Sequence, residues 1–209
     1  MQTQACPLCN STSSQFEENT FLICNNCKGI FRPQSQLPTE ISEKSRYEDH
    51  ENNATDVHYQ KFVEPITNAI FQNFTQNDTG LDFGSGASSP IKQVLTQKDY
   101  NIQQYDPFFH NNTNLLKQTY DYIAACEVIE HFHNPAKEFK LLYKLLKPTG
   151  TLLCMTHLYN ETIDFKNWYY RRDKTHTFIY QTETINYIQK AFNFQSNKIN
   201  NRLIIFTKK

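Results

Sequence analysis

The 209-residue sequence contains no long hydrophobic run. No apolar stretch reaches the roughly 20 residues that a membrane-spanning helix needs. The first residues, MQTQAC, have no basic region followed by an apolar stretch, so no secretory signal is visible. We therefore expect a cytoplasmic protein that makes no membrane contact.

An excess of charge of either sign is also missing. The chain has 21 basic and 21 acidic side chains, for a formal net charge of zero. Proteins that bind the phosphate backbone of nucleic acids normally carry a strong positive patch, so the balance argues against a nucleic-acid partner. The length allows one substantial core with a small appendage. The composition does not indicate an oligomeric state.

Four of the six cysteines form two CxxC motifs, separated by 14 residues. Cys6 and Cys9 make the first motif, and Cys24 and Cys27 make the second. Four thiolates in this spacing complete a tetrahedral zinc site with no open position, so the zinc is expected to be structural. Disulfides or a redox pair are the alternative. We predict a zinc ribbon over residues 1–33, with a short hairpin between the motifs.

Residues 34–55 are polar and interrupted by proline, which indicates a linker or a lid over the second domain. The remaining sequence, 56–209, alternates between helical and strand-like patterns. Such alternation predicts an α/β, Rossmann-like, mostly parallel sheet covered on both faces. Helices are expected at 56–75, from 89, from 134 and around 185–192, and strands at 80–83, 100–105, 122–126 and 151–155, with a final hairpin at 200–201.

Ligands of such sheets bind at the carboxyl ends of the strands, so the loops there should form one rim. The first loop, residues 84–89, reads GSGASS, with Ser89 where a dinucleotide motif has its third glycine. Asp82 would sit poorly beside a pyrophosphate and well beside the ammonium group of a methionine. Asp106, after the next strand, could accept both hydroxyls of a ribose. These residues favour S-adenosylmethionine over a nicotinamide cofactor.

From these motifs the chain resembles class I S-adenosylmethionine-dependent methyltransferases over about residues 56–209. The matching stretches are LDFGSG at 81–86, YDPF at 105–108 and CEVIEH at 126–131. Within this family, the chain most resembles small proteins that join a zinc ribbon to the methyltransferase domain, similar to the ubiquinone-biosynthesis type of methyltransferase. The resemblance implies a mostly parallel seven-stranded sheet whose last strand is antiparallel. The family's third strand has no clear counterpart at 109–120.

The resemblance also implies a set of cofactor contacts. The residues up to 86 would meet the methionine end, those at 106–108 the ribose and adenine, and those at 127–128 the methionine side. The residues so assigned are Asp82, Gly84, Ser85, Gly86, Asp106, Pro107, Phe108, Glu127 and Val128.

Most candidate acceptor-side residues follow the strand that ends near position 155, and His131 lies just past the end of the strand at 122–126. His176 could transfer a proton near neutral pH, and His131 is a second candidate, which could instead orient the rim. Aromatic rings could wall a substrate pocket and arginines could hold an anionic group. A packed loop with a salt bridge to Asp173 is the alternative. The predicted substrate-binding residues are Trp168, Tyr169, Tyr170, Arg171 and Arg172.

Together these patterns predict a methyltransferase that binds S-adenosylmethionine and a structural Zn²⁺ and acts on an unidentified, small-molecule acceptor. An NAD(P)-dependent oxidoreductase is the second hypothesis, disfavoured by Asp82 and the missing glycine. A non-catalytic module that pairs a zinc ribbon with a cofactor-binding domain is the third. An RNA methyltransferase is a variant that the neutral charge disfavours.

Overall fold

The computed structural model describes residues 4–17, 20–48 and 53–209. Within this part of the chain, the main sheet has six strands in the order β5-β4-β6-β7-β10-β9. The first four are parallel, and β10 is antiparallel to both of its neighbours. The strands are β4 (Thr79–Phe83), β5 (Asn101–Tyr105), β6 (Tyr120–Cys126), β7 (Leu146–Met155), β9 (Phe194–Asn200) and β10 (Leu203–Lys208).

The predicted Rossmann-like architecture is therefore confirmed, with its mostly parallel sheet and closing hairpin. The strand count of seven is wrong, because the sheet has six strands. In the region where the family has its third strand, residues Thr113–Lys117 form a short 3₁₀ helix, η2. The sequence between Asp106 and β6 is too short to hold a full strand and a crossover helix.

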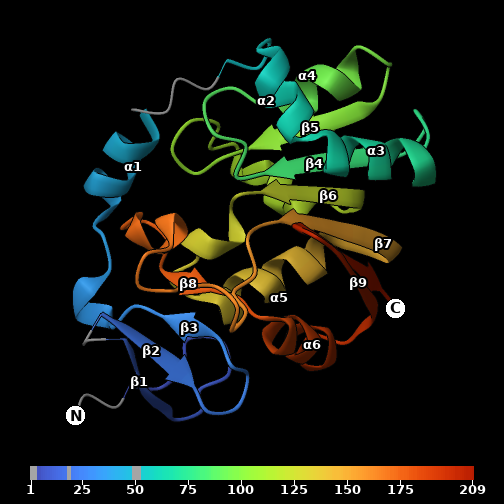
Figure 1. The fold of residues 1–209 in the computed structure, drawn as a ribbon. Coiled ribbons are helices and arrows are strands. Elements are labelled where there is room, and N and C mark those ends of the chain that lie inside the picture. The colour runs from blue at the N-terminus through green and yellow to red at the C-terminus, as the bar shows by residue number, and fades with distance from the viewer. Residues whose placement is uncertain (1–3, 18–19, 49–52) are drawn as a thin grey trace.

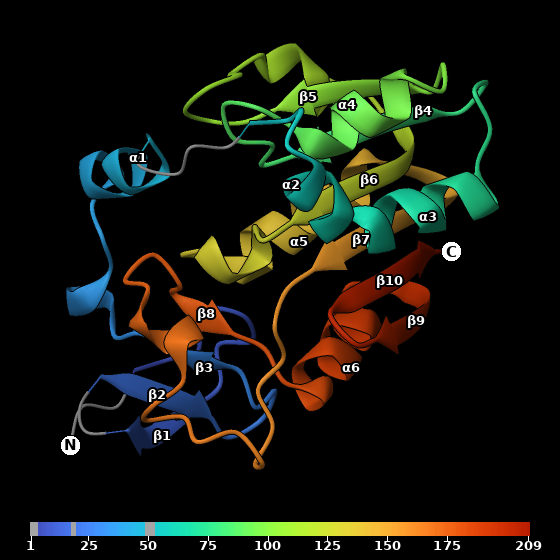
Figure 2. The ribbon, with the colours of Figure 1, turned by 45° about the horizontal axis from the view of Figure 1, so that its top comes forward.

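Helices cover both faces of the sheet, as Figures 1 and 2 show. Alternate residues of β6 point to opposite sides: Tyr122 and Ala124 join one core, while Ile123 and Ala125 join the other. The first core is closed by α2 (Val57–Phe62), α3 (Glu64–Asn73) and α4 (Pro90–Thr96). The second is closed by α5 (Pro135–Leu145) and α6 (Thr182–Ala191).

The helix expected at 56–75 is two helices that meet at Val63. Pro65 lies in the first turn of α3, where a missing N–H costs nothing, and it separates α3 from α2. The starts of α4 and α5 are as predicted. Ser89 and Asn134 cap these helices, each accepting a backbone N–H in the first turn.

The N-terminal segment forms a small antiparallel sheet of β1 (Ser13–Glu17), β2 (Phe21–Cys24) and β3 (Ile30–Phe31). The predicted hairpin between the CxxC motifs is β1–β2. A fourth strand, β8 (Phe178–Ile179), comes from the other end of the chain and pairs with β3. Buried ribbon residues such as Leu22 and Phe31 belong to the same core as α5 and α6.

The segment predicted as a linker or lid contains a 3₁₀ turn, η1 (Gln34–Gln36), and a helix, α1 (Glu40–Glu48). Its residues 49–52 lie outside the described part. Figure 1 shows α1 on the side toward which the arrowheads of β4, β5 and β6 point. No helix in the described ranges is long and apolar enough to cross a membrane.

Candidate functional site

The carboxyl ends of the parallel strands bring the predicted loops to one edge of the sheet. Asp82 and Phe83 pair with neighbours on β5, and Cys126 at the end of β6 pairs with Met155 at the end of β7. The residues that follow these strands therefore share one rim: the glycine loop, Asp106, residues 127–131 and His157.

Gly84 is required by conformation and by packing. Its φ is +74°, in the left-handed region that disfavours side chains, and Gly86 has a φ of +64°. A Cβ atom on Gly84 would lie 2.7 Å from both γ carbons of Val128. Two residues that the sequence assigned to the cofactor, Gly84 and Val128, are thus in contact at the rim.

Asp106 ties the second loop to the first. Its Oδ2 accepts the N–H of Gly86 at 2.9 Å, and its Oδ1 accepts those of Phe108 and Phe109 at 2.8 and 3.1 Å. Three amide donors leave part of the lone-pair capacity of the carboxylate for a ligand. The predicted ribose and adenine residues 106–108 therefore lie beside the glycine loop.

Asp82 is buried at the end of β4, with 3% of its surface exposed. Burial raises the pKa of its carboxyl to about 6, against the opposing effect of a hydrogen bond from Ser89. The Ser89 hydroxyl donates to Asp82 and also accepts the N–H of Lys92 at 2.9 Å. Ser89, which stands where a dinucleotide-binding motif has its third glycine, therefore makes two hydrogen bonds within the protein.

Glu127 follows β6 in a left-handed conformation, with a φ of +51°. Its Oε1 lies 2.5 Å from Nη2 of Arg202, which is in the β9–β10 hairpin. Burial and the nearby Glu130 raise the pKa of Glu127, and Arg202 opposes the rise. The sequence pattern did not identify Arg202 because it is 75 residues away from Glu127 in the chain.

Glu130 is fully buried at the rim, with no exposed surface. The Tyr170 hydroxyl donates to Oε1, and Thr156 Oγ1 lies 2.7 Å from the same hydroxyl. Oε2 has no hydrogen-bond partner among the described residues. A buried carboxylate oxygen without a donor is costly, which marks this group as a candidate for ligand binding or catalysis. In the sequence, the signal that could have identified Glu130 was its position in the CEVIEH stretch.

The two predicted catalytic histidines meet at Glu130. Their rings lie 4.9 Å apart, and Glu130, His131 and His176 each offer one ligand-type atom within 4.8 Å of the others. Nδ1 of His131 donates to Thr175 O at 3.0 Å, and Nδ1 of His176 donates to Tyr170 O at 2.7 Å. In the neutral rings Nε2 then carries the lone pair.

We call Glu130, His131 and His176 the acceptor cluster. Burial and the neighbouring His131 lower the pKa of His176 to about 4, so this ring is neutral at pH 7. Burial also raises the pKa of Glu130. Two imidazoles whose Nδ1 atoms donate to backbone carbonyls, together with a carboxylate, form a donor set that also fits a divalent cation.

The predicted substrate-binding residues lie around η4 (Tyr169–Arg172). The Tyr169 hydroxyl lies 2.7 Å from Nε2 of His157, and Tyr170 packs on His176 with ring centroids 4.1 Å apart. Trp168 packs against Tyr170.

The two arginines of this segment have intramolecular partners. Arg171 donates to Lys166 O at 3.0 Å and lies over Phe21 of the ribbon, and Arg172 donates to Asn167 O at 3.1 Å. Arg46 on α1, and not an arginine of the loop, makes the ion pair with Asp173 at 3.0 Å. Substrate contact by these arginines stays a prediction.

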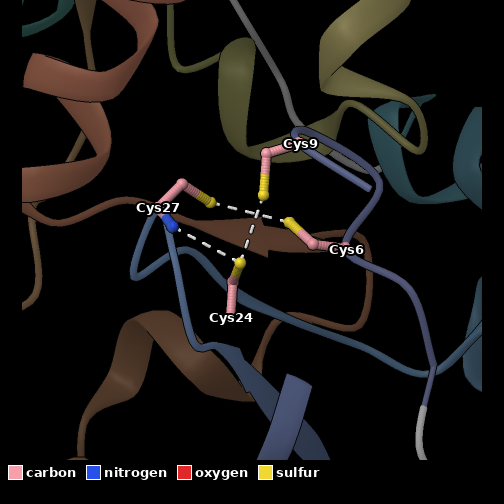
Figure 3. Close-up of side chains that lie close together, drawn as sticks. All are labelled: Cys6, Cys9, Cys24 and Cys27. Carbon is pink, nitrogen blue, oxygen red and sulfur yellow. Dashed lines mark hydrogen bonds between the residues drawn. The ribbon is translucent and has the colours of Figure 1, made fainter. Parts of the chain in front are cut away.

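The four cysteines of the two CxxC motifs converge with their sulfur atoms toward one another (Figure 3). The Sγ atoms of Cys6 and Cys27 are 3.6 Å apart, and those of Cys9 and Cys24 are 3.3 Å apart. All four are free thiols, with no disulfide among them. This closed set of four sulfurs fits the predicted structural zinc and leaves no position for a substrate.

A family model described as a methyltransferase domain matches residues 56–198. The chain belongs to this methyltransferase family. The match confirms the enzyme class expected from the glycine loop and the CEVIEH stretch, and it favours that class over the oxidoreductase hypothesis. Among curated proteins, no match to the sequence is found.

Solved structures show the same fold at low sequence identity. An O-methyltransferase family protein from Burkholderia thailandensis is 13% identical with a TM-score of 0.52, over 83% of this chain and 64% of that one. The 1,6-didemethyltoxoflavin-N1-methyltransferase of the same organism, with bound 1,6-didemethyltoxoflavin and S-adenosylhomocysteine, is 11% identical with a TM-score of 0.56, over 88% and 97%.

A methyltransferase from Archaeoglobus fulgidus, described as dependent on S-adenosylmethionine, is 15% identical with a TM-score of 0.51. The match covers 73% of this chain and 100% of that one. The chain thus spans less than two thirds of the first of these three proteins and nearly all of the other two. At these identities the likeness concerns the fold.

Proposed function

We propose that this chain is an S-adenosylmethionine-dependent methyltransferase whose acceptor is a small molecule with an ionisable hydroxyl group. The observation that carries the proposal is the acceptor cluster at the rim. Glu130 and His131 follow two and three residues after Val128, which packs on Gly84 of the glycine loop. Groups that accept protons therefore lie close to the loop assigned to the cofactor.

The rim has the features that the cofactor needs. Gly84 and Gly86 let the backbone approach a ligand, and Asp106 keeps lone-pair capacity for ribose hydroxyls. Asp82 would hold the ammonium group of the methionine moiety, which would favour its ionised form. Glu127 and Val128 would line the methionine side, and Pro107 and Phe108 the adenine. When bound, the cofactor supplies an activated methyl group on its sulfonium.

The acceptor cluster suits a hydroxyl because that group must lose its proton on methylation. The buried Glu130 is a stronger base than an ordinary carboxylate and can accept this proton, whereas the lowered pKa of His176 keeps its ring neutral at pH 7, with a lone pair at Nε2, but makes it a weaker base than an ordinary histidine. Tyr170 donates to Glu130 Oε1, and Oε2 has no hydrogen-bond donor among the described residues, so we assign the acceptor's proton to Oε2. Alignment of the nucleophile with the methyl carbon supplies much of the remaining rate.

Calorimetric titration with S-adenosylmethionine and S-adenosylhomocysteine tests the cofactor assignment. Asp106→Asn should weaken both by about tenfold or more, since the amide loses charge and lone-pair capacity. Glu183→Gln, which removes an exposed carboxylate on α6, is the matched control and should bind normally. Binding of NAD with no response to either sulfur compound would contradict the proposal.

Methyl transfer to a panel of phenols, catechols and amines tests the acceptor class. Glu130→Gln keeps the shape of the side chain but removes its base, so turnover of hydroxyl acceptors should fall by about a hundredfold or more. Affinity for S-adenosylhomocysteine should stay within twofold. Assays with a chelator and with added Mg²⁺ or Mn²⁺ show whether a cation takes part. Equal turnover by Glu130→Gln and the wild type would rule out this role.

A further inference from the structure

We propose that Arg32 of the zinc ribbon is a positioning residue for His176, so that the ribbon is part of the scaffold of the acceptor site. This inference rests on the proposed function, because it concerns the cluster that would take the acceptor's proton. It gives the ribbon a role that its closed set of four cysteines does not reveal. Three connected sets of contacts support it.

The first connection is a backbone ladder from the ribbon into residues 177–179, next to His176. β3 pairs with β8 through Ile30 with Ile179 and Phe31 with Phe178. The ladder continues one residue further, where the N–H of Arg32 donates to Thr177 O at 2.9 Å. Thr177, the residue that this last hydrogen bond reaches, directly follows His176 in the chain.

The second connection is the guanidinium of Arg32, which holds three carbonyl oxygens of the same segment. Nε donates to His176 O at 3.1 Å, and Nη2 donates to Arg171 O at 2.9 Å and to Asp173 O at 3.1 Å. The group also lies 4.5 Å from the ring centroid of Phe21, in β2 of the ribbon. The fixed fork of arginine donors suits this arrangement, which the single ammonium of lysine cannot reproduce.

The third connection leads from the segment to the rest of the acceptor cluster. The N–H of Thr177 donates to Glu130 O at 2.9 Å, and its hydroxyl donates to Phe132 O at 3.1 Å. His131 Nδ1 donates to Thr175 O, and His176 Nδ1 donates to Tyr170 O. A shift of residues 171–177 would therefore move His176 relative to Glu130 and His131, and an ångström of misplacement can cost about a hundredfold in rate.

The test uses the full-length, zinc-loaded protein with labelled histidine, studied by NMR at one fixed pH. The ring signals of His176 are assigned from their loss in His176→Gln. In Arg32→Gln these signals should shift or broaden, while those of His58 on α2 stay in place. Arg32→Lys should not rescue them. Lys28→Gln, which removes an exposed cation from the same ribbon, should leave His176 unchanged.

Zinc content and cofactor affinity separate positioning from general damage. Both Arg32 variants should keep one zinc per chain and bind S-adenosylhomocysteine within twofold of the wild type. Turnover of an acceptor that responds to Glu130→Gln should fall about tenfold or more. If Arg32→Gln does not fold, Arg32→Lys supplies the same readouts.

Unchanged His176 signals in a variant that retains zinc would overturn the inference, as would an equal shift of His58. The NMR readout does not depend on methyl transfer. A protein that binds no S-adenosyl compound but shows the His176 shift would therefore contradict the proposed function and leave the positioning contact established.

Discussion

At the scale of single residues, the rim concentrates three carboxyl groups that are expensive to bury. Asp82, Glu127 and Glu130 all have pKa values raised by burial. Each has one strong partner within the protein: Ser89 for Asp82, Arg202 for Glu127 and a tyrosine for Glu130. Groups with such perturbed pKa values gather at functional sites, because a ligand can repay part of the burial cost.

Asp82 gives a prediction for stability against pH. Its pKa is about 6 in the folded protein and close to 3.8 when unfolded. Between these values the folded state keeps a proton that the unfolded state has lost, so stability from this group falls as pH rises through the window. Two pKa units correspond to about 3 kcal/mol. Asp82→Asn should therefore remove a loss of about 3 kcal/mol in the free energy of unfolding, summed over this pH window.

Urea unfolding of the ligand-free protein at several pH values between 4 and 6.5 measures the difference. Glu127 and Glu130 add slopes of the same sign, so wild type and variant are compared at each pH. The amide oxygen of asparagine still accepts the hydrogen bond from Ser89, which limits other losses. An identical slope in the two proteins would show that Asp82 does not titrate in this range.

At the scale of secondary-structure elements, α1 is held over the rim by polar and aromatic contacts. Glu43 Oε1 lies 3.0 Å from His133 Nε2, and Arg46 pairs with Asp173. The ring of Tyr47 lies 5.4 Å from that of His131 and 5.8 Å from that of Phe108. The only buried residue of α1 is the charged Glu43, so a search for hydrophobic periodicity could not identify this helix from the sequence.

The docking of α1 should weaken as pH rises above neutrality. Glu43 raises the pKa of His133, so the contact contributes fully below the unfolded histidine pKa and is lost as pH passes the folded value. Hydrogen exchange of the α1 amides, corrected for the intrinsic rate, should show more opening at pH 8.5 than at pH 6. His133→Gln should abolish the difference.

If α1 opens equally at both pH values in the wild type, the His133–Glu43 pair does not hold it. Arg46→Gln supplies a comparison, because, against the opposing effect of burial, hydrogen bonds from Thr175 hold the pKa of its partner Asp173 below the usual range. That variant should loosen α1 at both pH values and keep the difference between them.

At the scale of the whole molecule, β8 joins the ribbon to the methyltransferase domain. The four-stranded sheet β1-β2-β3-β8 and the shared core make the ribbon an integral part of the body. Gly29 is needed at this junction, because a Cβ atom there would lie 2.2 Å from the ring of Phe178. The division of the chain at residues 33 and 55 stays a prediction.

Loss of the predicted zinc should therefore destabilise the chain as a whole. Cys24→Ser should reduce zinc to well below one per chain and lower the thermal midpoint by several degrees, since thiolate–zinc bonds stabilise the ribbon. Metal analysis and thermal unfolding measure both effects. Cys126→Ser, at a cysteine outside the ribbon, should retain zinc. A full complement of zinc in Cys24→Ser would contradict the four-cysteine site.

The sequence was sufficient for features that depend on local patterns. The glycine loop, Asp106 after β5 and the two CxxC motifs each follow from short-range spacing, and the parallel topology places the first two at one rim. Arg32 and Arg202 were missed because their partners are 144 and 75 residues away. The strand count was wrong because the resemblance supplied a third strand that residues 107–119 do not form.

The pairing of β3 with β8 also has a consequence for the order of folding. Arg32 and His176 are 144 residues apart, so their contact belongs to the most non-local part of the structure. During synthesis the cysteine motifs emerge first, long before β8 exists to complete the ribbon's sheet. Such distant pairings form slowly, because the entropy of closing the intervening chain must be lost first. The segment around His176 should therefore be among the last regions to reach its native arrangement.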